Sequence, residues 1–159
     1  MNRRLVGVVT GLALLALVAI AAAAANPALL ITGYETTTVE AVDGETGESL
    51  ATVEVRVADG LIKQYVGLSA TDGLDEGEGM LFVHDESDER AYVMREMAFA
   101  LDIVYVAPNG TVTTVHEAEP ESAPYTRYRG TGRYVLEVPR GWSERHGVEP
   151  GDRIRIGSE

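Results

Sequence analysis

The chain has 159 residues, of which 25 are Asp or Glu and 13 are Lys or Arg, and its formal net charge is −12. This charge repels phosphate backbones and argues against nucleic acid as a partner, while the lack of cysteine excludes disulfides, thiolate nucleophiles and cysteine-ligated metal sites. After a membrane segment is subtracted, the length suffices for one domain of roughly 120 residues.

The N-terminal segment 5–25 is apolar apart from Thr10, and as a helix it would span about 31 Å, which matches the hydrocarbon layer of a bilayer. Arg3 and Arg4 precede this segment, and the next basic residue is Arg56. The positive-inside rule therefore predicts a cytoplasmic N-terminus and a single-pass protein of the cell membrane, with its domain on the extracytoplasmic side.

Residues 23–25 are all alanine, and signal peptidase accepts small residues of this kind, so secretion after cleavage is the alternative. However, the apolar run is longer than the hydrophobic region of a usual signal peptide, which has about 7 to 15 residues, and apolar residues continue beyond the candidate site at 29–31. We expect an uncleaved membrane anchor or signal segment over residues 1–31.

After the anchor, apolar and polar residues alternate, which is typical of strands. Residues 36–42 and 50–57 are rich in Thr and Val and flank a glycine-containing loop at 43–47, so they predict a hairpin. A short helix is expected next, from an N-cap at Asp59 to about Ala70.

The rest of the chain predicts short strands separated by turns. Strands are expected at 80–83, 91–94, 101–106, 112–115, 134–138 and 153–156, with one helical turn at 142–146. The acidic, glycine-rich segment 71–79 is expected to be a solvated loop, with a weak calcium site as the alternative. The predicted fold is mostly β (α+β), a single compact sheet or barrel-like domain with one or two short helices, preceded by one transmembrane helix.

Five groups of residues occur in a characteristic order. They are Gly79-Met80-Leu81-Phe82, Met94-Arg95, Leu101-Asp102-Ile103, Leu136-Glu137-Val138 with Gly141-Trp142, and Gly147 with Gly151-Asp152. This order resembles the signature of the domain of unknown function 192 family, from about Ala51 to Ile156. The resemblance implies a compact, mostly β domain with one or two short helices, and it brings no established catalytic residues, substrate or cofactor.

The resemblance divides the chain into three parts: the anchor, a linker with the first hairpin strand at 32–50, and the family-like domain at 51–157. The chain departs from the family pattern in two places. Residues 93–97 read Val-Met-Arg-Glu-Met where the family usually has Trp-Met-Lys-Asn-Thr, and Gln64 stands where arginine is common. If those polar positions served a shared chemistry, this chain would lack part of it.

The basic residues are all arginine except Lys63. An acidic, lysine-poor composition is typical of proteins in concentrated salt, where a Debye length of about 3 Å at 1 M screens self-repulsion. We therefore expect a salt-adapted, archaeal member of the family, with a merely acidic protein from ordinary salt as the alternative.

Asp102 is a carboxylate inside the apolar run 101–106, and burying it without a partner would cost several kcal/mol. We expect an ion pair, for example with Arg95, or a turn cap. The alternative is a role as general base or ligand.

The histidines His84, His116 and His146 are widely separated, and their spacing matches no metal motif. Two of them could form a zinc or iron site with Asp102 or Glu117 only if the loops converge. Surface histidines are the better interpretation, and we expect no metal and no cofactor.

The one concentration of basic and aromatic residues lies between Tyr125 and Tyr134. Tyrosine rings can stack on sugars while arginines bind hydroxyls or carboxylates, although strand-forming tyrosines with surface ion pairs would show the same pattern. The candidate ligand-binding residues are Tyr125, Arg127, Tyr128, Arg129 and Arg133, together with Arg95.

Two functions follow from these patterns. We favour a non-enzymatic extracytoplasmic module that binds an envelope glycan, a small anionic ligand or a protein. The alternative is a small hydrolase, possibly metal-dependent, that uses Asp102 with His84 or His116 as its weak catalytic candidates.

Overall fold

The computed structural model describes residues 17–22, 25–26, 28 and 33–157, and the chain divides into two units, residues 1–33 and 34–159. In the first unit, residues 17–22 are helical. Most of the predicted membrane span at 5–25 lies outside the described residues. Among the helices that are described, none combines the length and the apolar character needed to cross a membrane.

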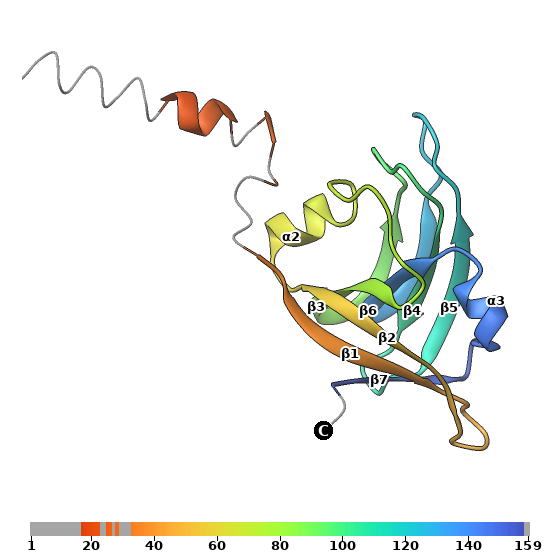
Figure 1. Ribbon diagram of the computed structural model, residues 1–159. Helices are drawn as coiled ribbons and strands as arrows, with labels where there is room; N and C mark the ends of the chain where they lie inside the picture. Colours follow the sequence, from red (N-terminus) through yellow and green to blue (C-terminus); the bar gives the residue numbers. More distant parts are fainter. Residues whose placement is uncertain (1–16, 23–24, 27, 29–32, 158–159) are drawn as a thin grey trace, which may run out of the picture. The chain divides into compact units, whose positions relative to one another are not determined.

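The second unit is built on a single sheet, which has seven strands in the described part of the chain (Figure 1). The strands are β1 (Glu35–Val42), β2 (Ser49–Ala58), β3 (Glu78–Tyr92), β4 (Leu101–Val106), β5 (Val112–Ala118), β6 (Tyr128–Pro139) and β7 (Arg153–Ile156), in the order β5-β4-β6-β3-β2-β1-β7. Neighbours are antiparallel except for β2 and β3, which are parallel and are connected through helix α2 (Leu61–Val66).

The sheet curls until its two edge strands meet at one end, near the bottom of the view in Figure 1. The Val112 amide donates to the Asp152 carbonyl at 2.8 Å, and the Ile154 amide donates to the Gly110 carbonyl at 2.8 Å. A Cβ atom on Gly110 would lie 2.7 Å from the Ile154 carbonyl oxygen, so only glycine permits this approach. The predicted mostly β, barrel-like fold is therefore confirmed as a half-barrel.

The two faces of the sheet carry separate apolar clusters. Leu81 belongs to the first cluster, whereas its neighbours Met80 and Phe82 belong to the second, because successive side chains of a strand point to opposite faces. Trp142, in helix α3 (Trp142–His146), packs into the first cluster, and Leu68, just beyond α2, packs into the second. With both faces covered, all six residues of β4 are buried.

Several predicted elements have the observed bounds or nearly so. The strands at 101–106 and 153–156 and the helical turn at 142–146 coincide with β4, β7 and α3, and the hairpin around 43–47 joins β1 to β2. The predicted strand at 112–115 continues to residue 118 in β5.

The predicted helix from Asp59 to Ala70 was wrong at both ends. The N-cap of α2 is Gly60, with no side-chain cap, because the Asp59 carboxylate instead pairs with Lys63 at 3.0 Å, one turn further on. The helix ends at Gly67, whose φ of 51° lies in the left-handed region that terminates helices.

Strands β3 and β6 are much longer than predicted. Residues 80–83 and 91–92 belong to one strand, and β6 begins at Tyr128 instead of Tyr134. The residues between 83 and 91 are mostly charged and exposed, so they show no alternation of apolar and polar side chains. In this stretch β3 bulges, between Val83 and Asp88.

Tyr105 joins the second cluster to strand β6. Its ring is fully buried, and its hydroxyl donates to the Tyr128 carbonyl at 2.7 Å. We expect Tyr105→Phe to lower the free energy of unfolding by about 1 kcal/mol, because one internal hydrogen bond is lost. Urea unfolding of the full chain measures this. The control is Tyr65→Phe, whose ring is 59% exposed, and an equal effect of the two substitutions would contradict the prediction.

Candidate functional site

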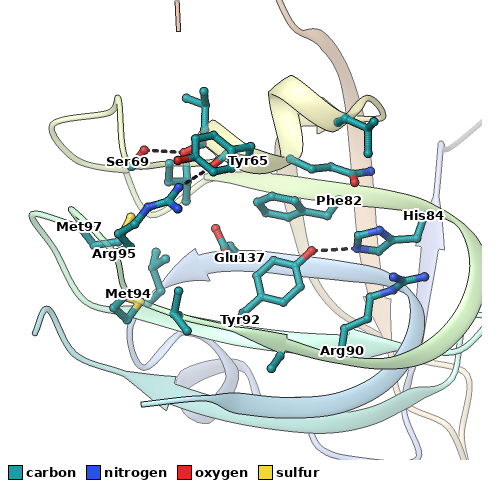
Figure 2. A pocket seen from close by; sticks show the side chains of 18 residues that line it. Tyr65, Ser69, Phe82, His84, Arg90, Tyr92, Met94, Arg95, Met97 and Glu137 are labelled. Carbon is teal, nitrogen blue, oxygen red and sulfur yellow. Dashed lines mark hydrogen bonds between the residues drawn. The ribbon is translucent and has the colours of Figure 1, made fainter. Parts of the chain in front are cut away.

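A cavity of about 440 Å³ lies between α2, strand β3 and the loop that follows β3 (Figure 2). Its walls are largely apolar, and Phe82, Met94 and Leu101 contribute buried side chains to them. This volume and this lining are typical of sites that enclose a small molecule.

The sheet register places Glu137 in this cavity. Strand β6 lies between β3 and β4, where Glu137 pairs with Met80 on one side and Ile103 on the other. Since Leu136 and Val138 point into the first apolar cluster, Glu137 must point to the opposite face. Figure 2 shows its carboxyl directed into the cavity beside Phe82 and Tyr92.

The Glu137 carboxyl has no hydrogen-bond partner among the described residues, although the residue is only 7% exposed. Burial raises its pKa to about 8, so at neutral pH the carboxyl holds a proton. Buried polar groups in native proteins are almost always paired, and an exception in a cavity marks a candidate functional group.

Tyr92 and His84 form the wall beside Glu137. The Tyr92 ring meets Phe82 edge to face, with centroids 5.1 Å apart, and its hydroxyl is hydrogen-bonded to His84 Nε2 at 2.9 Å. Burial, followed by the nearby Glu137, raises the pKa of Tyr92, while burial and then Arg90 lower the pKa of His84. At neutral pH this inner wall therefore carries no charge.

Two arginines line the cavity, and each makes a hydrogen bond through its guanidinium, but the buried Arg90 Nε has no partner among the described residues. The Arg95 guanidinium stacks on the Tyr65 ring at 4.2 Å and donates to the Tyr65 carbonyl at 2.9 Å (Figure 2). The Arg90 guanidinium donates to the Glu86 carbonyl at 2.8 Å.

The family model for the domain of unknown function 192 (DUF192), described as an uncharacterized ACR, matches residues 42–156. The chain belongs to the DUF192 family. All residues that line the cavity fall within this match.

Two solved structures resemble this DUF192 chain. A candidate transcription regulator from Sinorhizobium meliloti is 28% identical with a TM-score of 0.72, and the similarity covers 79% of this chain and 97% of that one. A protein of unknown function from Novosphingobium aromaticivorans is 24% identical with a TM-score of 0.67, covering 79% and 88%. No curated protein matches the chain.

The DUF192 fold gives Asp102 a structural role. It is 1% exposed, and its two carboxylate oxygens accept the Gly141 amide at 2.9 Å and the Ser143 amide at 2.8 Å, at the start of α3. The predicted turn cap is confirmed, while the suggested pair with Arg95 was wrong, since Arg95 contacts Tyr65. Asp102 does not line the cavity.

The three histidines have separate surroundings. His84 lines the cavity, His116 Nε2 is hydrogen-bonded to the Arg129 carbonyl at 2.7 Å, and the His146 ring lies 5.3 Å from that of Trp142. In the part of the chain that the structure describes, no three His, Asp or Glu side chains lie together as a metal site. The structure thus does not bring Asp102, His84 and His116 into one catalytic constellation.

The segment between Tyr125 and Tyr134 is not gathered into one surface, because β6 alternates its side chains between two faces. Tyr128 packs against the second apolar cluster, whereas Arg129 pairs with Glu89 at 3.0 Å. The Arg133 guanidinium donates to the His84 carbonyl at 3.2 Å. Tyr125 is half-buried, and Arg127 is exposed. Of the predicted ligand-binding residues, only Arg95 lines the cavity.

Sequence reasoning overlooked Glu137 and Tyr92 as site residues. A signal was available for Glu137, which interrupts an apolar strand in the same way as Asp102 does. Tyr92 follows the charged stretch 85–90 and carries no such signal, because only the fold brings it next to Glu137.

Proposed function

We propose that this DUF192 protein is a non-enzymatic binding module that encloses a small molecule in the cavity beneath α2. The observation that supports it is the Glu137 carboxyl, which is 7% exposed, has no partner among the described residues and faces a space of about 440 Å³. A ligand would supply the missing hydrogen bond, which explains why a polar group is kept there.

The lining favours holding a molecule over cleaving one. Apart from the tyrosines, Ser69 carries the only hydroxyl among the described lining residues, and it donates to the Val66 carbonyl at 2.6 Å. The one hydroxyl–imidazole pair among the described lining residues joins Tyr92 to His84, and burial raises the pKa of this tyrosine, which makes its hydroxyl a poor nucleophile at neutral pH. The hydrolase alternative needs Asp102 with His84 or His116, and neither Asp102 nor His116 lines this cavity.

We further propose that residues 5–25 anchor the domain in a membrane, with the cavity on the extracytoplasmic side. The apolar run and the position of Arg3 and Arg4 support this proposal, and the acidic, lysine-poor composition supports a salty environment. An envelope component of low molecular weight would then be within reach of the cavity.

Calorimetry on the full chain in lipid nanodiscs tests the binding site with three probes, 2-phenylethylamine, 2-phenylethanol and phenylacetate. They share a phenyl ring and differ in their polar group. We expect at least one of them to bind the wild type with 1:1 stoichiometry. Met94→Trp should abolish this binding, because the buried Met94 side chain lines the cavity and the larger indole ring would take up its space.

The matched control is Glu45→Trp, which adds the same ring at an exposed position of the β1–β2 loop. It should bind like the wild type, and urea unfolding checks that both variants are folded. Absence of binding for all three probes, or equal binding by Met94→Trp and the wild type, would rule out the proposed site.

A further inference from the structure

The acidic group inside the cavity points to one class of ligand. Glu137 is the only acidic residue among the described lining residues. Burial is the sole cause that raises its pKa, so no neighbouring cation offsets its charge. Two arginines also line the cavity: the Arg95 guanidinium is stacked on Tyr65, and the Arg90 guanidinium donates to the Glu86 carbonyl, while the buried Arg90 Nε has no partner among the described residues. Neither guanidinium is paired with Glu137, so this carboxyl lacks an ion-pair partner.

Aromatic rings flank this carboxyl. Phe82 and Tyr92, both on β3, meet at an interplanar angle of 83° and lie beside Glu137 in Figure 2. The face of an aromatic ring attracts a cation, and a desolvated ring does so more strongly than an exposed one. A carboxylate beside aromatic rings in an apolar cavity is the chemistry that recognises an ammonium group.

The surface next to the cavity is acidic. A second hollow shares His84 and Arg90 with the cavity, and it is bordered by Asp59, Asp85 and Glu86. These carboxylates, within a chain of net charge −12, raise the local concentration of cations and repel anions.

Resting on the proposed function, we propose that the ligand is an organic cation, an ammonium group on an apolar body, whose nitrogen pairs with Glu137 and lies against Phe82 and Tyr92. On binding, the Glu137 carboxyl releases its proton to solvent, and the resulting carboxylate pairs with the ammonium group. Charge is conserved, because one cation enters as one proton leaves.

The three phenyl probes separate this inference from the proposed function. At pH 8 the wild type should bind 2-phenylethylamine roughly tenfold or more tightly than 2-phenylethanol, because a charge-assisted pair replaces a neutral hydrogen bond. Phenylacetate should bind weakest. Glu137→Gln should remove the preference for the amine and retain binding of the alcohol, whereas Glu54→Gln, the same change at an exposed position, should leave both unchanged.

Proton release gives an independent readout. At pH 7, titrations in buffers of different ionisation enthalpy should show close to one proton released per amine bound, and none for the alcohol. From pH 6.5 to pH 8 the affinity for the amine should rise about 15-fold, since a group with a pKa of about 8 loses its proton.

The other titratable and charged groups around the Glu137 carboxyl do not produce this pH dependence of the affinity for the amine. Burial raises the pKa of Tyr92 and raises that of Tyr105 to about 12, burial and Arg90 lower the pKa of His84, and Arg90 and Arg95 stay charged.

Each outcome decides between the two proposals. If the alcohol or phenylacetate binds the cavity as tightly as the amine, the ligand is not a cation, although the cavity remains the binding site. The ligand is likewise not a paired cation if the amine binds without releasing a proton. If no probe binds, or if Met94→Trp binds all of them normally, both the binding function and the cation inference are wrong.

Discussion

The Glu137→Gln variant should gain stability relative to the wild type as the pH rises, by about 4 kcal/mol between pH 5 and pH 9. The folded chain holds the Glu137 proton with a pKa of about 8, against 4.5 for an ordinary glutamate. Stability from this group is therefore complete below pH 4.5 and is lost as the pH rises towards 8. Glutamine cannot ionise, so its contribution is constant over this range.

Urea unfolding of the full chain at pH 5, 7 and 9 measures this effect as the difference between the two free energies of unfolding. The difference cancels the titration of every other group, including His84. Glu54→Gln is the control and should follow the wild type at each pH, because Glu54 is exposed. A constant difference between Glu137→Gln and the wild type would show that the carboxyl is not held protonated.

The second large effect is expected for Asp102→Ala, which should lower the free energy of unfolding by about 3 kcal/mol. The substitution removes the acceptor of two amides, those of Gly141 and Ser143, at the start of α3. Ser143 is 4% exposed, so water cannot readily replace the lost bond. Helix α3 also positions Trp142 in the first apolar cluster, so the packing of Trp142 would be loosened as well.

Asp72→Ala is the matched control, because Asp72 is exposed in the loop before β3, and it should change the free energy of unfolding by no more than about 0.5 kcal/mol. Near-ultraviolet circular dichroism of the single tryptophan should report a loosened α3 in Asp102→Ala alone. Equal stability of the two variants would mean that the carboxylate does not hold the helix.

The membrane span at 5–25 is predicted from a local sequence pattern alone. Its apolar length and its flanking arginines predict an anchor and an orientation, and both stay predictions, because most of the segment lies outside the described residues. Fractionation of cells that express the full chain measures this directly. Recovery of the intact polypeptide without membranes would contradict the anchor.

Local patterns predicted the elements best where the signal is short and bounded by turn residues. Strand β4 is an apolar run, strand β7 alternates, and helix α3 is closed by Gly147, and all three were predicted with the observed bounds. The extent of β3 was not predictable in this way. Its charged middle leaves the regular pairing with β6 between Val83 and Asp88, and the pairing resumes at Asp88, which shows that the two halves form one strand.

The sequence alone determined a mostly β domain, its family signature and the need of Asp102 for a partner, because alternation and burial costs act within a few residues. The sequence could not show that Asp102 and Glu137 have different roles, because both interrupt apolar strands. The tertiary structure decided between them, since β4 turns Asp102 towards the amides of α3, while β6 turns Glu137 towards a cavity. The walls of that cavity come from residues 61–69, 82–101 and 137, which only the curled sheet brings together.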